Sequence, residues 1–145
     1  MLMDQNTNES SDLYQEARRL MNENHFEDAI ALFQRSAELD AHFKTLELLG
    51  ECYVRLNRLR EAIIPLTTAV DLNKGVRAAS LLADVFLKLK DYDAAKETAE
   101  VALSREPNNK KALEVLKVVA NINGDAQQFN GRECETAILL STVFL

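Results

Sequence analysis

A pattern of small and large residues occurs three times along the chain at constant spacing, and it limits the possible fold more than any other feature. Ala29, Ala62 and Ala95 lie 33 residues apart. Each alanine has an aromatic residue or leucine three positions before it and a small residue seven positions after it. The residues before are Phe26, Leu59 and Tyr92, and those after are Ser36, Ala69 and Ala102. Self-similarity at a period of 20–50 residues predicts a stack of repeated supersecondary units.

Each unit has the pattern of two amphipathic helices. Apolar residues recur at spacings of three and four, as at Leu46, Leu49 and Tyr53, which is typical of a helix with one buried face. This apolar pattern breaks at a short polar turn and then resumes in the second helix of the unit. The sequence predicts helices at about 11–22 and 26–40, 44–56 and 59–73, and 77–89 and 92–105. With only 4 Gly and 2 Pro, the chain lacks the tight turns that a sandwich or barrel requires, which favours an all-α fold.

The details of the repeat resemble the tetratricopeptide repeat (TPR). Leu49-Gly50 with Tyr53 and Leu82-Ala83 with Phe86 match its first helix, Ala29 with Phe33 matches its second, and Pro107 closes the third unit. The resemblance covers residues 10 to 122 and implies an α-solenoid of three antiparallel helix pairs plus a C-terminal capping helix. The sequence departs from the family where Ala41 and Lys74 replace the closing proline, and its period is one residue short.

We expect six segments in this order: a disordered polar N-terminus at 1–9, repeats at about 10–42, 43–75 and 76–109, a capping helix at 110–124 and a hydrophobic tail at 125–145. The tail ends in TAILLSTVFL, which carries no charged residue and would be an association hazard in water. Three alternatives stay open for it. It folds back over the last repeat, it pairs with a second copy to form a homodimer, or it is foreign or truncated sequence.

Composition bears on the compartment and on the class of partner. The net charge of −6 disfavours general binding to nucleic acid or to an anionic membrane. The opening MLMDQNTNES lacks the basic start and apolar core of a secretory signal, and no apolar run approaches the length of a membrane-spanning helix. Cys52 and Cys134 lie far apart and form no disulfide framework. These features predict a cytoplasmic protein.

The sequence offers little that could support catalysis. His25 and His42 fall at expected turns with no metal-ligand spacing between them, and Glu47 with Glu51 fits a solvated helix face. Cys52 lies among apolar neighbours and is expected to be a small core residue. We therefore predict no enzyme, no catalytic residue, no cofactor and no metal site.

The resemblance also implies a binding surface, because first helices of TPR units line a groove that holds a segment of a partner. The positions that correspond to this groove are Tyr14, Arg18, Met21, Asn22, Lys44, Glu47, Glu51, Val54, Arg55, Arg77, Ser80, Asp84, Leu87 and Lys88. They comprise five cations and three anions, a net charge of +2, so the rest of the chain carries −8. The groove is thus expected to be positive on an acidic protein. The alternative is that these residues are simply solvated helix faces.

Some TPR domains bind the C-terminal carboxylate of heat-shock chaperones through a clamp of Lys, Asn and Arg. The corresponding positions here are Tyr14, Arg18, Leu48, Arg77 and Leu81. Because leucine donates no hydrogen bond, a clamp of that design is not expected. The predicted function is a non-enzymatic protein–protein interaction module whose groove binds a protein or peptide partner. One alternative is a small TPR chaperone for a dedicated client, resembling the class II chaperones of type III secretion, and another is a regulatory subunit joined to an enzyme.

Overall fold

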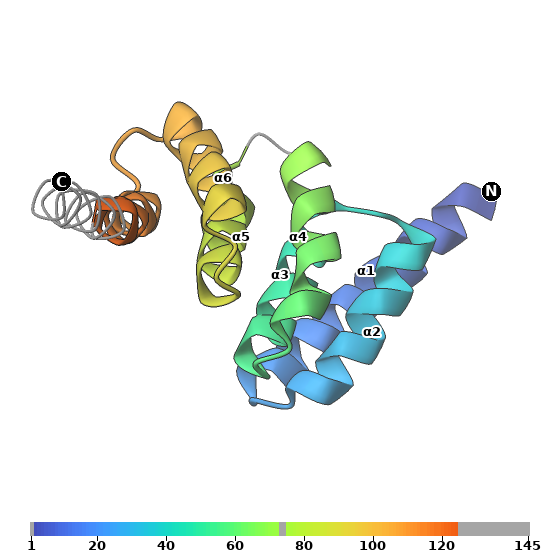
Figure 1. Ribbon diagram of the computed structural model, residues 1–145. Coiled ribbons are helices and arrows are strands. Elements are labelled where there is room, and N and C mark those ends of the chain that lie inside the picture. The colour runs from blue at the N-terminus through green and yellow to red at the C-terminus, as the bar shows by residue number, and fades with distance from the viewer. Residues whose placement is uncertain (1, 73–74, 125–145) are drawn as a thin grey trace, which may run out of the picture.

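Six helices follow one another in antiparallel pairs in the computed structural model, which describes residues 2–72 and 75–124 (Figure 1). Residues 110–124 are also helical, and the described residues contain no strand. The all-α solenoid of three helix pairs and a terminal helix is therefore confirmed. The pairs are α1 (Leu2–Asn22) with α2 (Phe26–Leu39), α3 (Phe43–Arg55) with α4 (Leu59–Leu72), and α5 (Arg77–Lys88) with α6 (Tyr92–Arg105).

The start of α1 differs from the expectation. Residues 1–9 were expected to be disordered, and this was wrong for residues 2–9, which belong to α1. The cause is a contact between α1 and α2, in which each of two buried serines donates a hydrogen bond to the backbone carbonyl of the other. Ser10 Oγ donates to the Ser36 carbonyl at 3.0 Å, and Ser36 Oγ donates to the Ser10 carbonyl at 2.8 Å. Glu9 adds an ion pair to Arg35 at 3.3 Å. These contacts hold residues 9 and 10, just before the predicted start, against α2, and α1 continues from there back to Leu2.

The first helix of every pair ends in the same turn. Asn24, Asn57 and Lys90, again 33 residues apart, have positive φ angles of 64°, 58° and 63°. In each turn this residue's N–H donates to the carbonyl three residues back, and the next N–H donates to the carbonyl five residues back. This pair of bonds is the Schellman motif, which satisfies the last carbonyls of a helix and reverses the chain. The short polar turns predicted at Asn57-Arg58 and Lys90-Asp91 are confirmed.

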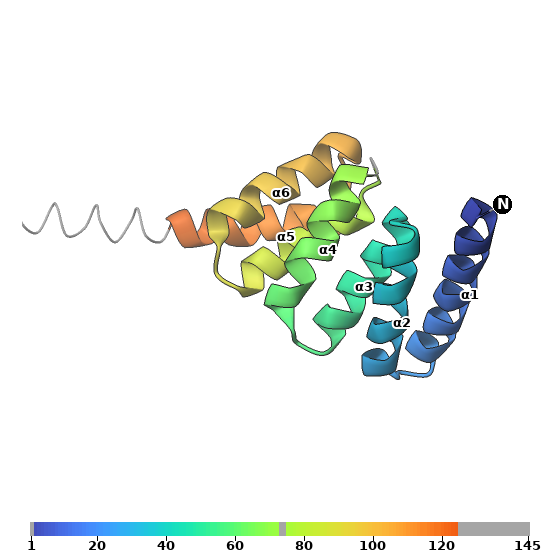
Figure 2. The same ribbon diagram turned by 90° about the vertical axis from the view of Figure 1, so that its right-hand side faces the viewer.

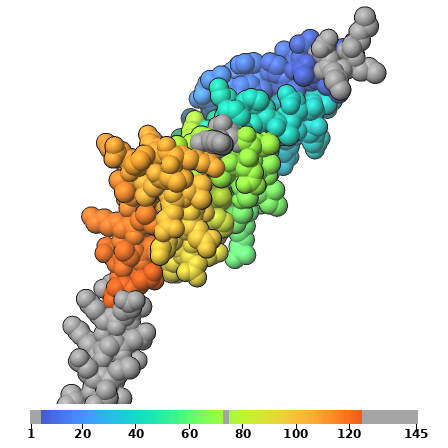
Figure 3. All heavy atoms as spheres, turned by 90° about the horizontal axis from the view of Figure 1, so that it is seen from above, coloured from blue at the N-terminus to red at the C-terminus, as the bar shows by residue number. Residues whose placement is uncertain are grey.

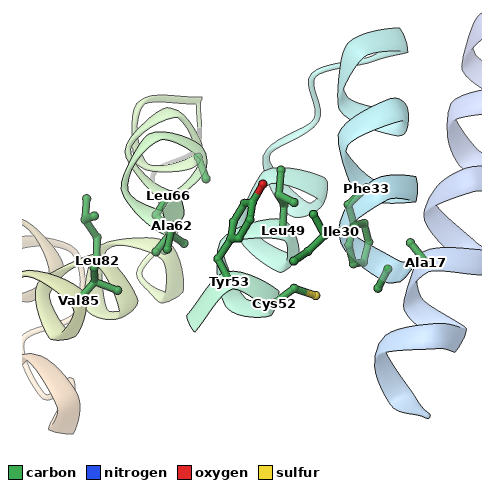
Figure 4. Close-up of a cluster of buried hydrophobic side chains, with 13 residues drawn as sticks. Ala17, Ile30, Phe33, Leu49, Cys52, Tyr53, Ala62, Leu66, Leu82 and Val85 are labelled. Atoms are coloured by element: carbon green, nitrogen blue, oxygen red, sulfur yellow. The ribbon is translucent and has the colours of Figure 1, made fainter. Parts of the chain in front are cut away.

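Small residues allow the helices to lie close together. Ala29, Ala62 and Ala95, the residues that revealed the repeat, are fully buried. Larger side chains fill the space between successive helices. Phe33 of α2 lies beside Ala17 of α1, and farther along the stack the core continues from α3 to α5 (Figure 4). The labelled members of this continuation are Leu49, Cys52, Tyr53, Ala62, Leu66, Leu82 and Val85.

The helices stack in sequence order along the long axis of the molecule (Figures 2 and 3). Within the described residues, α1 lies at one end and the 110–124 helix at the other. The terminal helix closes a second core cluster, in which Val115 and Val119 pack with alanines of α5 and α6. Asn109 begins this helix as its cap, because its Oδ1 accepts a hydrogen bond from Ala112 N at 3.0 Å. The hydrophobic tail at 125–145 lies outside the described residues, and so do the three alternatives left open for it, the homodimer among them.

Candidate partner-binding groove

Two cavities lie along the first helices of the repeats. One, of about 400 Å³, opens between α1 and the start of α3. It is lined by Thr7, Ser10, Ser11, Tyr14, Gln15, Arg18, Asp40, His42, Lys44 and Thr45. We call it the first cavity. Its lining is mostly hydroxyl, amide and charged groups, which suits a polar ligand group.

A second cavity, of about 390 Å³, continues from α1 across α3 to the start of α5. Its lining residues are Arg18, Met21, Asn22, Asn24, Phe26, Leu48, Glu51, Arg55 and Arg77. Arg18 belongs to both linings. The two cavities therefore adjoin at Arg18, and we call the pair, which lies along α1, α3 and the start of α5, the groove.

The structure brings eight of the fourteen groove residues named from the sequence into these two linings. They are Tyr14, Arg18, Met21, Asn22, Lys44, Glu51, Arg55 and Arg77. The others have different surroundings. Ser80 is buried and its hydroxyl donates to the Arg77 carbonyl at 3.0 Å, so this hydroxyl supports α5. Asp84 and Lys88 pair with each other at 3.1 Å on α5. Glu47 contacts Arg77, and Val54 and Leu87 are partly buried among the core residues.

An ion-pair network joins α3 to α5 at the floor of the second cavity. Arg77 of α5 pairs with Glu47 at 3.4 Å and, through its Nη2, with Glu51. Glu51 also pairs with Arg55 at 3.6 Å. Both carboxylate side chains are only 13% exposed, whereas Arg77 is 56% exposed. The positive charge of this part of the groove is therefore largely neutralised by the protein itself.

Burial shapes the electrostatics of the network. Burial raises the pKa of Glu47 above its usual value, whereas the Arg77 guanidinium opposes the rise; nearby Glu51 adds to it and Lys44 opposes it. An ionised Glu47 thus depends on its cationic neighbours. A further carboxylate entering this part of the groove would compete with both glutamates for the same guanidinium.

Several lining residues were missed by sequence reasoning. Thr7, Ser11 and Gln15 belong to the part of α1 that was either expected to be disordered or not assigned to the groove. His42 is at the expected turn, and its Nδ1 accepts a hydrogen bond from Lys44 N at 3.2 Å. It therefore caps α3 while it lines the first cavity. The helical i, i+4 spacing of Thr7, Ser11 and Gln15 could have identified them once α1 was extended.

The reactivity of Cys52 and the possibility of a metal site or a membrane-spanning helix can also be judged from the structure. Cys52 is fully buried, as expected for a core residue, and burial raises the pKa of its thiol to about 12. In the described ranges, no three His, Cys, Asp or Glu side chains are grouped so that they could hold a metal ion. None of the helices in those ranges is long and apolar enough to span a membrane.

Comparisons with known proteins agree with this architecture. A family model described as tetratricopeptide repeat matches residues 76–109, and one described as "Anaphase-promoting complex, cyclosome, subunit 3" matches residues 1–69. A search of curated proteins gives no match.

Solved structures with a similar fold are TPR domains. The Arabidopsis OM64 TPR domain has a TM-score of 0.75 at 19% identity, with 80% of this chain and 98% of that chain covered. The first TPR of Spaghetti (RPAP3), bound to the HSP90 peptide SRMEEVD, has a TM-score of 0.76 at 21% identity, with 81% and 95% covered. The Sgt2 TPR domain from Aspergillus fumigatus has a TM-score of 0.74 at 22% identity, with 83% of this chain and 82% of that chain covered. The tetratricopeptide-repeat model at residues 76–109, the three sequence repeats and the helix pairs with their recurring turns identify the chain as a tetratricopeptide-repeat protein, and the solved structures share its fold.

Proposed function

We propose that this protein is a non-enzymatic interaction module that holds an extended segment of a partner protein in the groove along α1, α3 and α5. The observation that carries the proposal is the adjoining pair of cavities, of about 400 and 390 Å³, that share Arg18. Together they hollow the surface along the first helices of all three repeats. A segment of several residues can lie in such a hollow, with alternate side chains entering it.

The composition of the walls supports a peptide ligand. The first cavity provides hydrogen-bonding groups, among them Ser11 and Gln15, and the second provides the apolar surfaces of Met21, Phe26 and Leu48. A mixed lining of this kind suits a polypeptide, which presents both backbone amides and apolar side chains. The Spaghetti domain with its bound peptide supports the same use of the fold.

The partner segment is not expected to be held by the carboxylate clamp described above. Leu48 lines the second cavity and Leu81 packs against the core, so neither position supplies a hydrogen-bond donor from its side chain. The specificity of this groove must therefore come from other residues, among them those of the first cavity.

Selection from a random peptide library displayed on phage tests the proposal with the full chain. Selected peptides should bind reversibly when synthesised, and their addition to ¹⁵N-labelled protein should shift amide signals of α1, α3 and α5. Signals of α2, α4 and α6 that are distant from the groove serve as the internal control. The proposal fails if no selected peptide binds or if the shifts gather on the second helices.

A further inference from the structure

Positive charge is unevenly distributed along the groove. Beyond Lys44, every cation named from the sequence on α3 and α5 has an acidic partner. Arg77 pairs with Glu47 and Glu51, Arg55 with Glu51, and Lys88 with Asp84. Because these pairs already satisfy one another, a ligand carboxylate gains little there and meets the two glutamates.

In the first cavity, by contrast, the cations have no acidic partner among the described residues. Arg18 and Lys44 both line it, and neither makes an ion pair with the residues in 2–72 and 75–124. The Arg18 guanidinium lies over the ring of Tyr14, 5.7 Å from its centroid, so its position is defined without a carboxylate. Asp40 also lines the cavity and offsets part of the charge. The +2 expected for the whole groove thus resides in these two cations.

We propose that an acidic side chain of the partner segment binds in the first cavity between Arg18 and Lys44, and that this contact sets the register of the segment in the groove. The inference rests on the proposed function and adds the chemical class of the partner. Carboxylates are the natural complement of two unpaired cations beside hydroxyl and amide donors, because hydrogen bonds between ionised partners are about twice as strong as neutral ones. The residue that follows the acid along the segment would then meet the apolar and self-neutralised second cavity.

This arrangement differs from the carboxylate clamp because Lys44 supplies the second cation. Lys44 is the second residue of α3 and comes immediately after the turn that His42 caps. The acidic group is therefore held at the α1–α3 end of the groove, whereas Arg77 at the α3–α5 junction stays engaged with its own glutamates.

The sequences of the selected peptides provide the first test. Peptides that bind in the groove should be enriched in Asp or Glu at one fixed position, with an apolar residue nearby.

Titration of a fluorescently labelled selected peptide then compares Arg18→Gln and Lys44→Gln with Arg60→Gln and Lys110→Gln. The two control residues are exposed, and they lie on α4 and on the terminal helix. Each first-cavity variant should weaken binding by about tenfold, and each control by less than about twofold. Added salt should also weaken binding to the parent and should act less on the double variant.

A second peptide, with the acidic residue replaced by its amide, completes the experiment. It should bind the parent as weakly as the acidic peptide binds the Arg18→Gln, Lys44→Gln double variant. The inference is overturned, while the proposed function stands, if selected peptides shift groove signals yet carry no acidic preference or bind the first-cavity variants and controls equally. If no peptide binds at all, the proposed function fails and the inference fails with it. Thermal unfolding of each variant verifies that a lost affinity does not reflect a lost fold.

Discussion

Gly50 of α3 and Leu66 of α4 are packed so closely that a Cβ atom at position 50 would lie 2.4 Å from Leu66 Cγ. Contacts under 3.0 Å essentially never occur for real Cβ atoms, so any larger residue would force the Leu66 side chain or one of the two helices to shift. Leu66 is fully buried and cannot turn away into solvent. The separation of α3 and α4 in the second repeat therefore depends on the absence of a side chain at Gly50.

Replacing Gly50 with alanine should lower the free energy of unfolding by up to about 2 kcal/mol, because an overpacking cost of about 1–3 kcal/mol exceeds the roughly 1 kcal/mol that alanine gains in helix propensity. Gly124→Ala is the matched control, since residue 124 is also helical and nothing lies within 4 Å of a Cβ there. That variant should be neutral or slightly stabilising. Urea unfolding measures both. Equal effects from the two substitutions would show that the α3–α4 contact is looser than described.

The alanines that define the repeat should tolerate no enlargement. Ala62→Leu and Ala95→Leu each place three extra carbons where the parent residue is 0% exposed, and each should cost about 1–3 kcal/mol. Ala31→Leu on α2 is exposed and should change stability by less than about 0.5 kcal/mol. Unfolding midpoints for all three in urea test the expectation. Parent-like midpoints for Ala62→Leu and Ala95→Leu would contradict the assigned register.

The serine pair between α1 and α2 gives a test of the extended first helix. Ser10→Ala removes a buried hydroxyl that donates to the Ser36 carbonyl and lies 3.0 Å from Ser36 Oγ. It should destabilise the protein by about 1 kcal/mol. Ser11→Ala, one position along on the exposed side, should have almost no effect. If the two variants unfold alike, the start of α1 does not pack on α2.

Cys52 should be inert in the native protein. Burial raises the pKa of its thiol from 9.0 to about 12, so the reactive thiolate is scarce at neutral pH and also inaccessible. In a Cys134→Ser background, iodoacetamide should label Cys52 only as the protein unfolds in urea, and mass spectrometry follows the reaction. Because the folded pKa is raised, the thiol contributes stability below the unfolded value that is lost as pH rises from 9.0 towards 12. Rapid labelling without denaturant would contradict the burial.

Glu47 should make the protein more sensitive to rising pH. Its pKa is raised in the folded state from a usual 4.5, so the folded protein holds this proton more tightly than the unfolded chain does. Its contribution to stability is therefore present below pH 4.5 and is lost as pH rises through the raised pKa. Glu47→Gln should remove that loss and leave the variant as stable as the parent or more stable at neutral pH, by less than about 1 kcal/mol because the site is partly solvated.

The control for this prediction is Glu114→Gln, an exposed glutamate on the terminal helix. Its variant should follow the pH profile of the parent. Urea midpoints measured from acidic to neutral pH compare the three proteins. A Glu47→Gln variant that is clearly less stable than the parent at neutral pH would show that the attraction to Arg77 outweighs the cost of burial.

Much of the fold could be read from the sequence because its determinants are local. The 33-residue spacing of Ala29, Ala62 and Ala95 fixes the repeat, and the periodicity of apolar residues fixes which helix faces are buried. The turns could also be predicted from the sequence, because the end of a helix depends on a few consecutive residues such as Asn57-Arg58. The helix and turn signals lie within one or two turns of the chain, where spacing and geometry are directly related, and the 33-residue period shows that the same local signals recur in each unit.

The start of α1 and the charge of the groove were decided only by tertiary structure. Ser10 is held in a helix by Ser36, 26 residues away, and no local pattern in the polar N-terminus indicates that contact. Five cations and three anions at the groove positions follow from the sequence alone, but their pairing depends on separations of a few ångströms between side chains on different helices. Once α3 and α5 are packed, Arg77 meets Glu47 and Glu51, whereas Arg18 and Lys44 face the first cavity. A count of charges is a property of the sequence, but the position of the unpaired charge is a property of the packed helices.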